Sequence, residues 1–238
     1  MMNYIFDGHC HLEAASEFND RKLAVASIQL SDIESLVTYR EQNPKSKIGY
    51  GLHPWFIKEL PNYQQMIFDI EKYKPDFIGE CGLDFLKPDH ELQIKICHLH
   101  CRLAIHYNLP IVFHCVRAYN ELLQIIKQYP KLRGLIHAFN GNNEMARQFN
   151  SKGFMLGIGS ILMNENSQLA KSIIKFDENM LVFESDSPFM ALPDKLKSTP
   201  DDCMLYAEKF AILKYKSLES VVIKSNQNWY RLFSNTIM

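Results

Sequence analysis

Phe6-Asp7-Gly8-His9-Cys10-His11 lies close to the N-terminus and directly follows the apolar residues Tyr4 and Ile5. These apolar residues predict a buried strand that runs into the two histidines. Side chains alternate between the faces of a strand, so His9 and His11 point to one side and Cys10 to the other. Paired imidazoles are half of a metal site, although a His-x-His pair alone is common in proteins that bind no metal. The rest of the chain decides between these alternatives.

Short apolar runs alternate with longer amphipathic runs along the whole sequence. We expect strands at residues 4–6, 23–28, 47–52, 76–82, 110–114, 134–139, 154–158 and 181–186. We expect helices at residues 31–42, 61–73, 88–107, 119–129, 143–151, 170–174, 201–214 and 218–233, with the last helix packed on the outside of the strands. Residues 189–200 show no periodicity and predict a loop over the barrel mouth.

Strands that are apolar throughout and alternate with helices indicate a parallel sheet that is covered on both faces. About eight such units predict an α/β fold of one domain over residues 1–238, a distorted TIM (β/α)8 barrel. A doubly wound open sheet is the alternative, but it would usually have fewer strands.

The composition excludes a strongly basic nucleic-acid-binding protein. The chain has 238 residues, of which 47% are hydrophobic, and 26 basic and 27 acidic side chains give a net charge of −1. An anionic substrate would therefore need a local positive site, which bound metal ions would provide.

The six cysteines form no Cys-x-x-Cys pair, which favours reduced, buried thiols in a cytoplasmic protein. Met1–Tyr4 shows no secretory leader, and no apolar run approaches the roughly 20 residues of a membrane helix. We therefore expect a cytoplasmic protein without a membrane partner. The sequence leaves the oligomeric state open, with a monomer as one option.

Ionisable residues recur where the expected strands end. They are His9 and His11 at the first strand, Glu80 in the fourth, His114 in the fifth, His137 in the sixth and Asp186 in the eighth. The carboxyl ends of barrel strands meet at one face, where such enzymes place their reacting groups. Four histidines and two carboxylates exceed the needs of one metal ion and match two ions that share a bridging carboxylate. Such a pair suits transfer of a phosphoryl group to water.

The cysteines next to these residues have a different expected role. Cys10, Cys81 and Cys115 each follow a candidate ligand by one position, so we expect them to face the helices as core residues. Cys97, His100 and Cys101 share one face of the long fourth helix. They could hold a metal, but no fourth ligand is evident, and a buried helix face is the preferred interpretation.

Six motifs in chain order resemble those of TatD-type metal-dependent deoxyribonucleases, within the wider group of amidohydrolase-like metal barrels. The motifs are Asp7-Gly8-His9-Cys10-His11-Leu12, Gly51-Leu52-His53-Pro54-Trp55, Ile78-Gly79-Glu80-Cys81-Gly82-Leu83-Asp84, Pro110-Ile111-Val112-Phe113-His114, His137-Ala138-Phe139-Asn140-Gly141 and Glu184-Ser185-Asp186-Ser187-Pro188. They span nearly the whole chain.

The resemblance implies a distorted TIM barrel with two divalent metal ions (Zn, Mn or Mg) that hydrolyses phosphodiester bonds of DNA. It implies a 3′-to-5′ exonuclease, and we expect DNA with single-stranded ends as the substrate. Carried over by position, His9, His11 and Asp186 hold one metal ion, His114 and His137 hold the other, and Glu80 bridges them. Asp186 would also orient or deprotonate the attacking water.

The chain departs from the family pattern where the family contacts substrate. Val116 stands where relatives usually carry an arginine, and Arg117 follows it as the candidate phosphate contact. His100 stands where the family often has glutamine. The segment after Pro188 contains Lys195 and Lys197 in place of the usual arginine and Asn-Pro elements.

Further candidates lie beside the expected metal site. His53 could bind a phosphate or carry a proton as a catalytic residue, or make only a structural hydrogen bond. Trp55, Phe85 and Phe139 follow strand ends and could stack nucleobases as substrate-binding residues, or pack loops against one another.

Two other functions remain open from the sequence. The same metal pair could hydrolyse an ester or amide, such as a lactone or an aminoacyl-tRNA ester. Glu80 stands where some amidohydrolases use a bridging lysine, which favours the phosphodiesterase by analogy only. Alternatively, the barrel could be a non-catalytic scaffold subunit, although such proteins tend to lose ligands that this chain retains.

Overall fold

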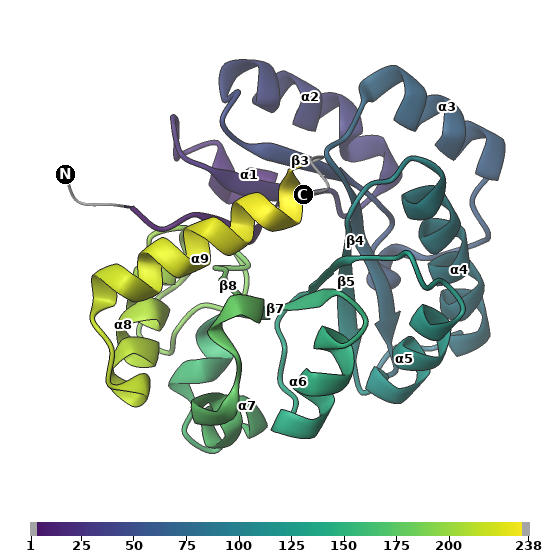
Figure 1. Cartoon of the computed structure of the whole chain (residues 1–238). Helices are drawn as coiled ribbons and strands as arrows, with labels where there is room; N and C mark the ends of the chain where they lie inside the picture. Colours follow the sequence, from purple (N-terminus) through teal and green to yellow (C-terminus); the bar gives the residue numbers. More distant parts are fainter. Residues whose placement is uncertain (1–3, 235–238) are drawn as a thin grey trace.

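The computed structural model describes residues 4–234 and contains eight parallel strands that pair in sequence order (Figure 1). The strands are β1 (Asp7–His11), β2 (Leu23–Ala26), β3 (Lys47–Tyr50), β4 (Phe77–Asp84), β5 (Ile111–Val116), β6 (Gly134–Ile136), β7 (Phe154–Ile158) and β8 (Leu181–Phe183). The expected TIM barrel is therefore confirmed, and the open doubly wound sheet is excluded.

The barrel is distorted where its first and last strands meet. Two backbone hydrogen bonds join them: Asp186 N donates to His9 O at 2.9 Å, and His11 N donates to Ser187 O at 2.8 Å. Both bonds involve residues beyond the end of β8, so the closure brings Asp186 alongside the two N-terminal histidines.

Helices surround the strands (Figure 1). They are α1 (Leu12–Ala15), α2 (Ile33–Gln42), α3 (Tyr63–Tyr73), α4 (His90–His106), α5 (Tyr119–Lys127), α6 (Asn143–Asn150), α7 (Gln168–Ser172), α8 (Asp202–Lys214) and α9 (Leu218–Phe233), with short 3₁₀ turns that include η2 (Pro54–Phe56) and η3 (Ser160–Met163). Outward strand residues and the apolar faces of the helices form the larger apolar cluster, which includes Val25, Ile48 and Leu122.

Helix α9 closes the end of the barrel, which corrects the expectation that it packs on the outside. Trp229, Leu232 and Phe233 cluster with inward-facing strand residues such as Val112 and Leu135, and Figure 1 shows α9 lying across the strands. The indole Nε1 of Trp229 also donates to Asp7 O at 3.0 Å. An amphipathic pattern predicts that a helix buries one face, but it does not predict which surface of the protein covers that face.

The two ends of the barrel interior have opposite character. Val112 and His114 share the inward face of β5 because side chains alternate along a strand, and Leu135 and His137 are likewise two positions apart. Val112 and Leu135 lie in the apolar cluster under α9. The histidines, two positions further toward the carboxyl ends, therefore face the opposite mouth.

Several element ends differ from the sequence-based expectations. Strand β1 begins at Asp7, so Tyr4–Phe6 precede it and the histidines lie within it. Strands β6 and β8 end at Ile136 and Phe183, because the backbone turns left-handed at Ala138 and Asp186, with φ of 45° and 54°. Helix α3 begins at Tyr63 rather than at Pro61, since the side chain of Asn62 caps it.

Strand β4 is irregular at the residue that matters most for the site. The β4–β5 register shifts between Ile78 and Cys81, as in a β-bulge, and such bulges redirect side chains beside active sites. Gly79, within this stretch, has φ of 138°, and a Cβ there would lie 2.7 Å from Val112 O. Only glycine fits this position without strain, which directs the next residue, Glu80, into the barrel.

The six cysteines are unpaired and buried, as the sequence predicted. The expected buried face of α4 is also present. His100 is fully buried, its Nδ1 lies 2.9 Å from Ile96 O, and its Nε2 accepts from Leu52 N at 3.2 Å. His100 therefore positions the backbone that leads to His53.

We expect His100→Gln to reduce the acid sensitivity of folding. Burial lowers the pKa of His100 from 6.5 to about 4, whereas an unfolded histidine protonates near 6.5. The unfolded state therefore binds the extra proton first, and the wild type loses about 3 kcal/mol of unfolding free energy from this residue between those values. Urea unfolding from pH 7 to 4 with chelator should show a shallower decline for His100→Gln. The exposed His106→Gln should match the wild type, and equal slopes for all three proteins would contradict the prediction.

Within residues 4–234, every helix is too short or too polar to cross a lipid bilayer. The expectation about a secretory leader concerns Met1–Tyr4, and the first three of these residues lie outside the described part of the chain.

Candidate metal centre

A cavity of about 720 Å³ opens at the carboxyl ends of the strands. Its floor contains His11, Glu80, His114, His137 and Asp186, and each comes from a different part of the barrel. The fully buried His9 lies just beneath, with its Nε2 3.1 Å from Glu80 Oε2. The structure thus brings together all six side chains that the sequence singled out as candidate ligands.

Glu80 lies at the centre and divides these side chains into two groups. Its Oε2 is 3.1 Å from His9 Nε2 and 3.5 Å from His11 Nε2. Its Oε1 is 2.9 Å from His114 Nδ1 and 3.4 Å from His53 Nε2. Each carboxylate oxygen therefore faces its own pair of imidazoles, which is the arrangement of a bridging ligand.

Asp186 lies over the first group. Its Oδ1 is 3.3 Å from His11 Nε2 and 3.6 Å from both His9 Nε2 and His137 Nε2. Sets of three residues with ligand atoms within 4.8 Å of one another are His9–His11–Glu80, His9–His137–Asp186 and His53–Glu80–His114. His137 thus lies closer to Asp186 than to Glu80 Oε1, which is 3.9 Å away. His53 also lies beside His114, with its Nε2 3.1 Å from His114 Nδ1.

Unsatisfied buried atoms indicate that these residues fit divalent cations. Neither ring nitrogen of His9 has a hydrogen-bond partner among residues 4–234, although Nε2 faces two carboxylates. His114 Nε2 is also buried without a partner of good geometry. Uncompensated polar atoms are costly in an interior, and a set of imidazoles and carboxylates binds zinc, manganese or similar ions.

The charges of the centre keep its carboxylates ionised. Burial alone would raise the pKa of Glu80, but its electrostatic interactions with the imidazoles of His53, His9 and His137 outweigh burial and hold the pKa well below the usual value. Burial likewise opposes ionisation of Asp186, and His137 and His11 lower its pKa. Both side chains are therefore available as anionic ligands.

Glu184 orients His137, a role that the sequence analysis missed. Its Oε1 accepts from Ala138 N at 2.6 Å and lies 2.8 Å from His137 Nδ1, an ion-pair contact without the alignment of a hydrogen bond. Burial lowers the pKa of His137, but Glu184, Asp186 and Glu80 outweigh it and raise the pKa to about 10. A carboxylate that holds the outer nitrogen of an imidazole fixes the ring and exposes the other nitrogen to a ligand. The available signal was a carboxylate directly after the apolar residues Leu181–Phe183, since a buried charge needs a partner.

Asp84 supports His114 in the same way and connects it to Trp55. Its Oδ2 accepts from Trp55 Nε1 at 2.6 Å and lies 3.4 Å from His114 Nε2, while Oδ1 accepts from Leu86 N at 2.9 Å. Burial raises the pKa of Asp84, but these contacts outweigh it and lower the pKa below the ordinary range. The exposed Trp55 is therefore held in place by a residue that touches the centre.

His53 has a defined donor and acceptor side. Its Nδ1 accepts from Trp55 N at 3.1 Å, so in the neutral ring the hydrogen is on Nε2. Burial lowers the pKa of His53, which favours this neutral form. Nε2 faces His114 Nδ1 at 3.1 Å and Glu80 Oε1 at 3.4 Å. This tautomer makes His53 a hydrogen-bond donor toward the centre rather than a metal ligand.

Part of the strained backbone lies at the cavity. Arg117, Ala138, Asp186 and Met190 all line it, and all have φ between 45° and 56°. Left-handed conformations cost free energy for non-glycine residues and are typical of functional sites.

The candidate substrate-binding residues occupy different environments in the structure. Trp55 and Arg117 line the cavity, and both are exposed. Phe139 is fully buried against Tyr119 and Phe149, so the expectation that it stacks a base is wrong for this structure. Lys195 and Lys197 form ion pairs with Asp202 and Glu13.

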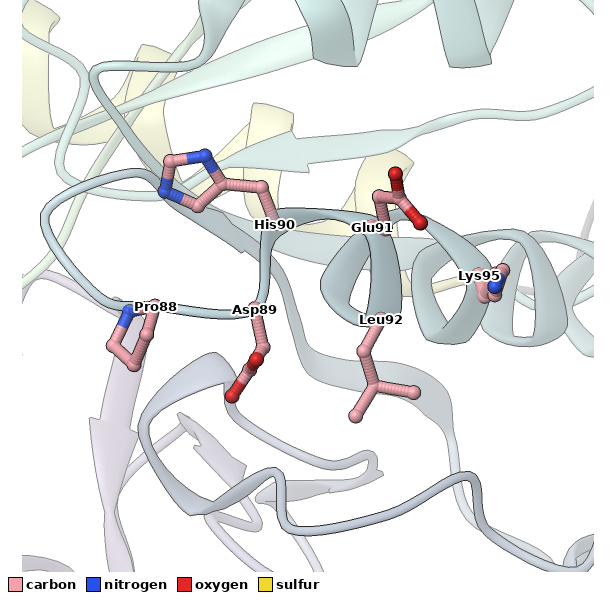
Figure 2. Close-up of a pocket in the computed structure, with 6 residues that line it drawn as sticks. All are labelled: Pro88, Asp89, His90, Glu91, Leu92 and Lys95. Atoms are coloured by element: carbon pink, nitrogen blue, oxygen red, sulfur yellow. The ribbon is translucent and has the colours of Figure 1, made fainter.

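Phe85 lies outside the cavity lining. Its ring stacks on His90, with centroids 4.1 Å apart and planes at 13°. Figure 2 shows His90 at the start of α4, pointing away from Asp89 and Leu92. His90 lines a separate open hollow of about 470 Å³. Phe85 therefore packs against His90 and does not contact the cavity that would hold the substrate.

A family model described as "TatD related DNase" matches residues 6–234. The chain belongs to the TatD family. Relatives of this TatD chain include an uncharacterized metal-dependent hydrolase, YabD, of Bacillus subtilis, 26% identical over 96% of this chain and 98% of its own length. A human protein named Deoxyribonuclease TATDN3 is 25% identical over 96% of this chain and 94% of its own length.

Solved structures agree with the barrel assignment of this TatD chain. The crystal structure of the TatD homologue YjjV from Escherichia coli superimposes with a TM-score of 0.87 at 22% identity and covers 98% of this chain and 99% of that one. A TatD family hydrolase from Entamoeba histolytica gives a TM-score of 0.81 at 21% identity, covering 99% and 100%. The family of metal-dependent hydrolases and the barrel are thus established for this chain.

Proposed function

We propose that this TatD-family hydrolase cleaves phosphodiester bonds of DNA as a 3′-to-5′ exonuclease on single-stranded ends, with two divalent metal ions. The observation that carries the proposal is the position of Glu80, whose two oxygens face two separate groups of ligands at the base of an open cavity. Two cations on either side of one carboxylate suit a phosphoryl group that exchanges one oxygen for another. The deoxyribonuclease named among the relatives supports DNA as the substrate.

His9, His11 and Asp186 would hold one cation, His114 and His137 would hold the other, and Glu80 would contribute to both. When bound, such cations supply Lewis acidity and lower the pKa of water. Asp186 Oδ1 accepts a proton from the attacking water, and the Nε2 hydrogen of His53 donates to a phosphate oxygen. The reaction consumes one water and yields a phosphomonoester and a free sugar hydroxyl.

The position of Arg117 supports a phosphate ligand. It is the sole lysine or arginine among the described residues that line the cavity, and its guanidinium can bind two oxygens of one phosphate. A single cation at the mouth, with further positive charge supplied by metal ions, fits one bound phosphate better than a long polyanion.

End-labelled single-stranded oligonucleotides test this proposal directly. Protein purified without added metal should shorten them from the 3′ end only after addition of Mg²⁺, Mn²⁺ or Zn²⁺, and chelator should stop the reaction. Asp186→Asn should abolish it. Activity that survives both chelator and Asp186→Asn would contradict the proposal. Hydrolysis of carboxylic esters without any cleavage of DNA would move the assignment to the ester or amide alternative.

A further inference from the structure

Three exposed aromatic side chains line the cavity, Trp55, Phe56 and Phe189, and two of them, Phe189 and Trp55, lie beside different ligand groups. The ring of Phe189 lies 5.3 Å from that of His11 and meets it at 71°. The ring of Trp55 lies 6.5 Å from that of His114 at 73° and 5.5 Å from that of His53. Since His11 and His114 face opposite oxygens of Glu80, the two aromatic rings flank the bridging carboxylate.

Trp55 is fixed and offers one face. Its indole Nε1 donates to Asp84 Oδ2 at 2.6 Å, and Lys87 Nζ lies 4.3 Å from the ring centroid. Lys87 is not part of the cavity lining, whereas Trp55 is. The indole remains 56% exposed, which is unusual for a tryptophan held by a buried carboxylate.

Phe189 is fixed by its backbone. Its amide donates to Asp186 O at 2.8 Å, and its carbonyl accepts from the Ser198 hydroxyl, whose residue is buried. The side chain nevertheless remains 49% exposed at the cavity. A large apolar ring on a hydrogen-bonded backbone that is left uncovered is a candidate contact for a planar ligand.

The rest of the cavity favours a ligand with apolar parts and one anionic group. Ile28, Ile161 and Met190 line it beside the two rings, and Arg117 is the single lysine or arginine among its described lining residues. A volume of about 720 Å³ lies within the range of roughly 300–1,000 Å³ that holds one drug-sized ligand. A dinucleotide has that size, two planar bases and one internal phosphate.

We propose that the site binds one dinucleotide unit, with its phosphate at the proposed metal centre around Glu80 and its two bases stacked on Trp55 and Phe189. This inference rests on the proposed phosphodiesterase function and specifies the substrate that the cavity recognises. Stacking on aromatic rings tolerates every base, so the walls would give no sequence preference. Longer strands would gain little, because the cavity offers few cations for further phosphates.

Steady-state kinetics with three substrates test the two aromatic walls, which are the rings of Trp55 and Phe189. They are a dithymidine phosphodiester and its two analogues that lack either the 5′ or the 3′ base. Trp55→Ala and Phe189→Ala should each raise KM for the dinucleotide roughly tenfold. Each variant should leave KM unchanged for the one analogue that lacks the base stacked on the missing wall, and this analogue should differ between the two variants. An equal rise with all three substrates, or no rise, would overturn the proposal.

Matched variants separate stacking from structural damage. Trp55→Phe keeps an aromatic face, so it should retain most of the dependence of KM on the base. It loses the hydrogen bond to Asp84, and any effect of this loss on His114 should appear in kcat. Phe68→Ala removes a ring that is also 56% exposed but does not line the cavity, and it should match the wild type. Loss of base dependence in Phe68→Ala would overturn the assignment to the two walls.

A binding measurement tests the site independently of turnover. Trp55 is exposed and Trp229 is 2% exposed, so quenching of fluorescence by a slowly hydrolysed phosphorothioate dinucleotide should report Trp55. We expect quenching that disappears in Trp55→Phe and an affinity that changes less than about threefold for a twelve-nucleotide strand. No quenching, or affinity that rises tenfold with length, would overturn the inference. If quenching occurs but no phosphodiester is cleaved with any metal, the proposed function fails and the binding site stands.

Discussion

Replacing Glu80 by glutamine (Glu80→Gln) is expected to slow hydrolysis by about 10³-fold or more and to reduce the bound metal. The two oxygens of Glu80 face different imidazole groups, with His9 at 3.1 Å and His114 at 2.9 Å. An amide has no charge and only one oxygen, so at least one group loses its anionic ligand. Loss of about 4 kcal/mol of transition-state stabilisation, the order supplied by a catalytic metal, corresponds to this factor.

Metal analysis and steady-state kinetics of the purified Glu80→Gln protein would check this expectation. Glu208→Gln, which makes the same change at an exposed position on α8, should keep wild-type activity and metal content. Unchanged metal stoichiometry together with unchanged turnover in Glu80→Gln would show that the carboxylate does not bridge cations.

Adding one methyl group at Gly157 is expected to reduce activity by about 10- to 100-fold, although Gly157 is not itself a candidate ligand. A Cβ at this position would lie 2.0 Å from Glu184 Oε2. The carboxylate would have to move, and it is the group that lies 2.8 Å from His137 Nδ1. Gly157→Ala should therefore misorient His137 while the strand β7 that contains it remains folded.

A double-mutant cycle checks this mechanism by kcat and thermal melting. If the methyl group acts only by displacing Glu184, Gly157→Ala should have little further effect in a Glu184→Ala background. Equal, independent losses from the two changes would contradict the mechanism, and so would a Gly157→Ala protein of full activity.

The barrel and the convergence of the six candidate ligands could be predicted because both depend on periodicity. Apolar runs that alternate with helices indicate parallel strands, and an ionisable residue at the end of each run must lie at the common carboxyl face. His114 and His137, for example, come together because β5 and β6 are adjacent and in register. The assignment of these residues to particular cations stays a prediction.

Other features depend on packing that one-dimensional patterns do not encode. Phe139 follows a strand end as Trp55 does, yet Tyr119 and Phe149 bury it completely, while Trp55 remains exposed. The position of α9 beneath the barrel and the contact between Glu184 and His137 likewise join distant segments. Each of these contacts could be predicted only by knowing which surfaces of the protein pack together.

Anomalous scattering from a crystal grown with Mn²⁺ tests the central claim most directly. The account predicts two peaks separated by Glu80, one near His9, His11 and Asp186 and the other near His114, with a different oxygen of Glu80 directed at each. A single peak, or peaks that do not contact Glu80, would contradict it.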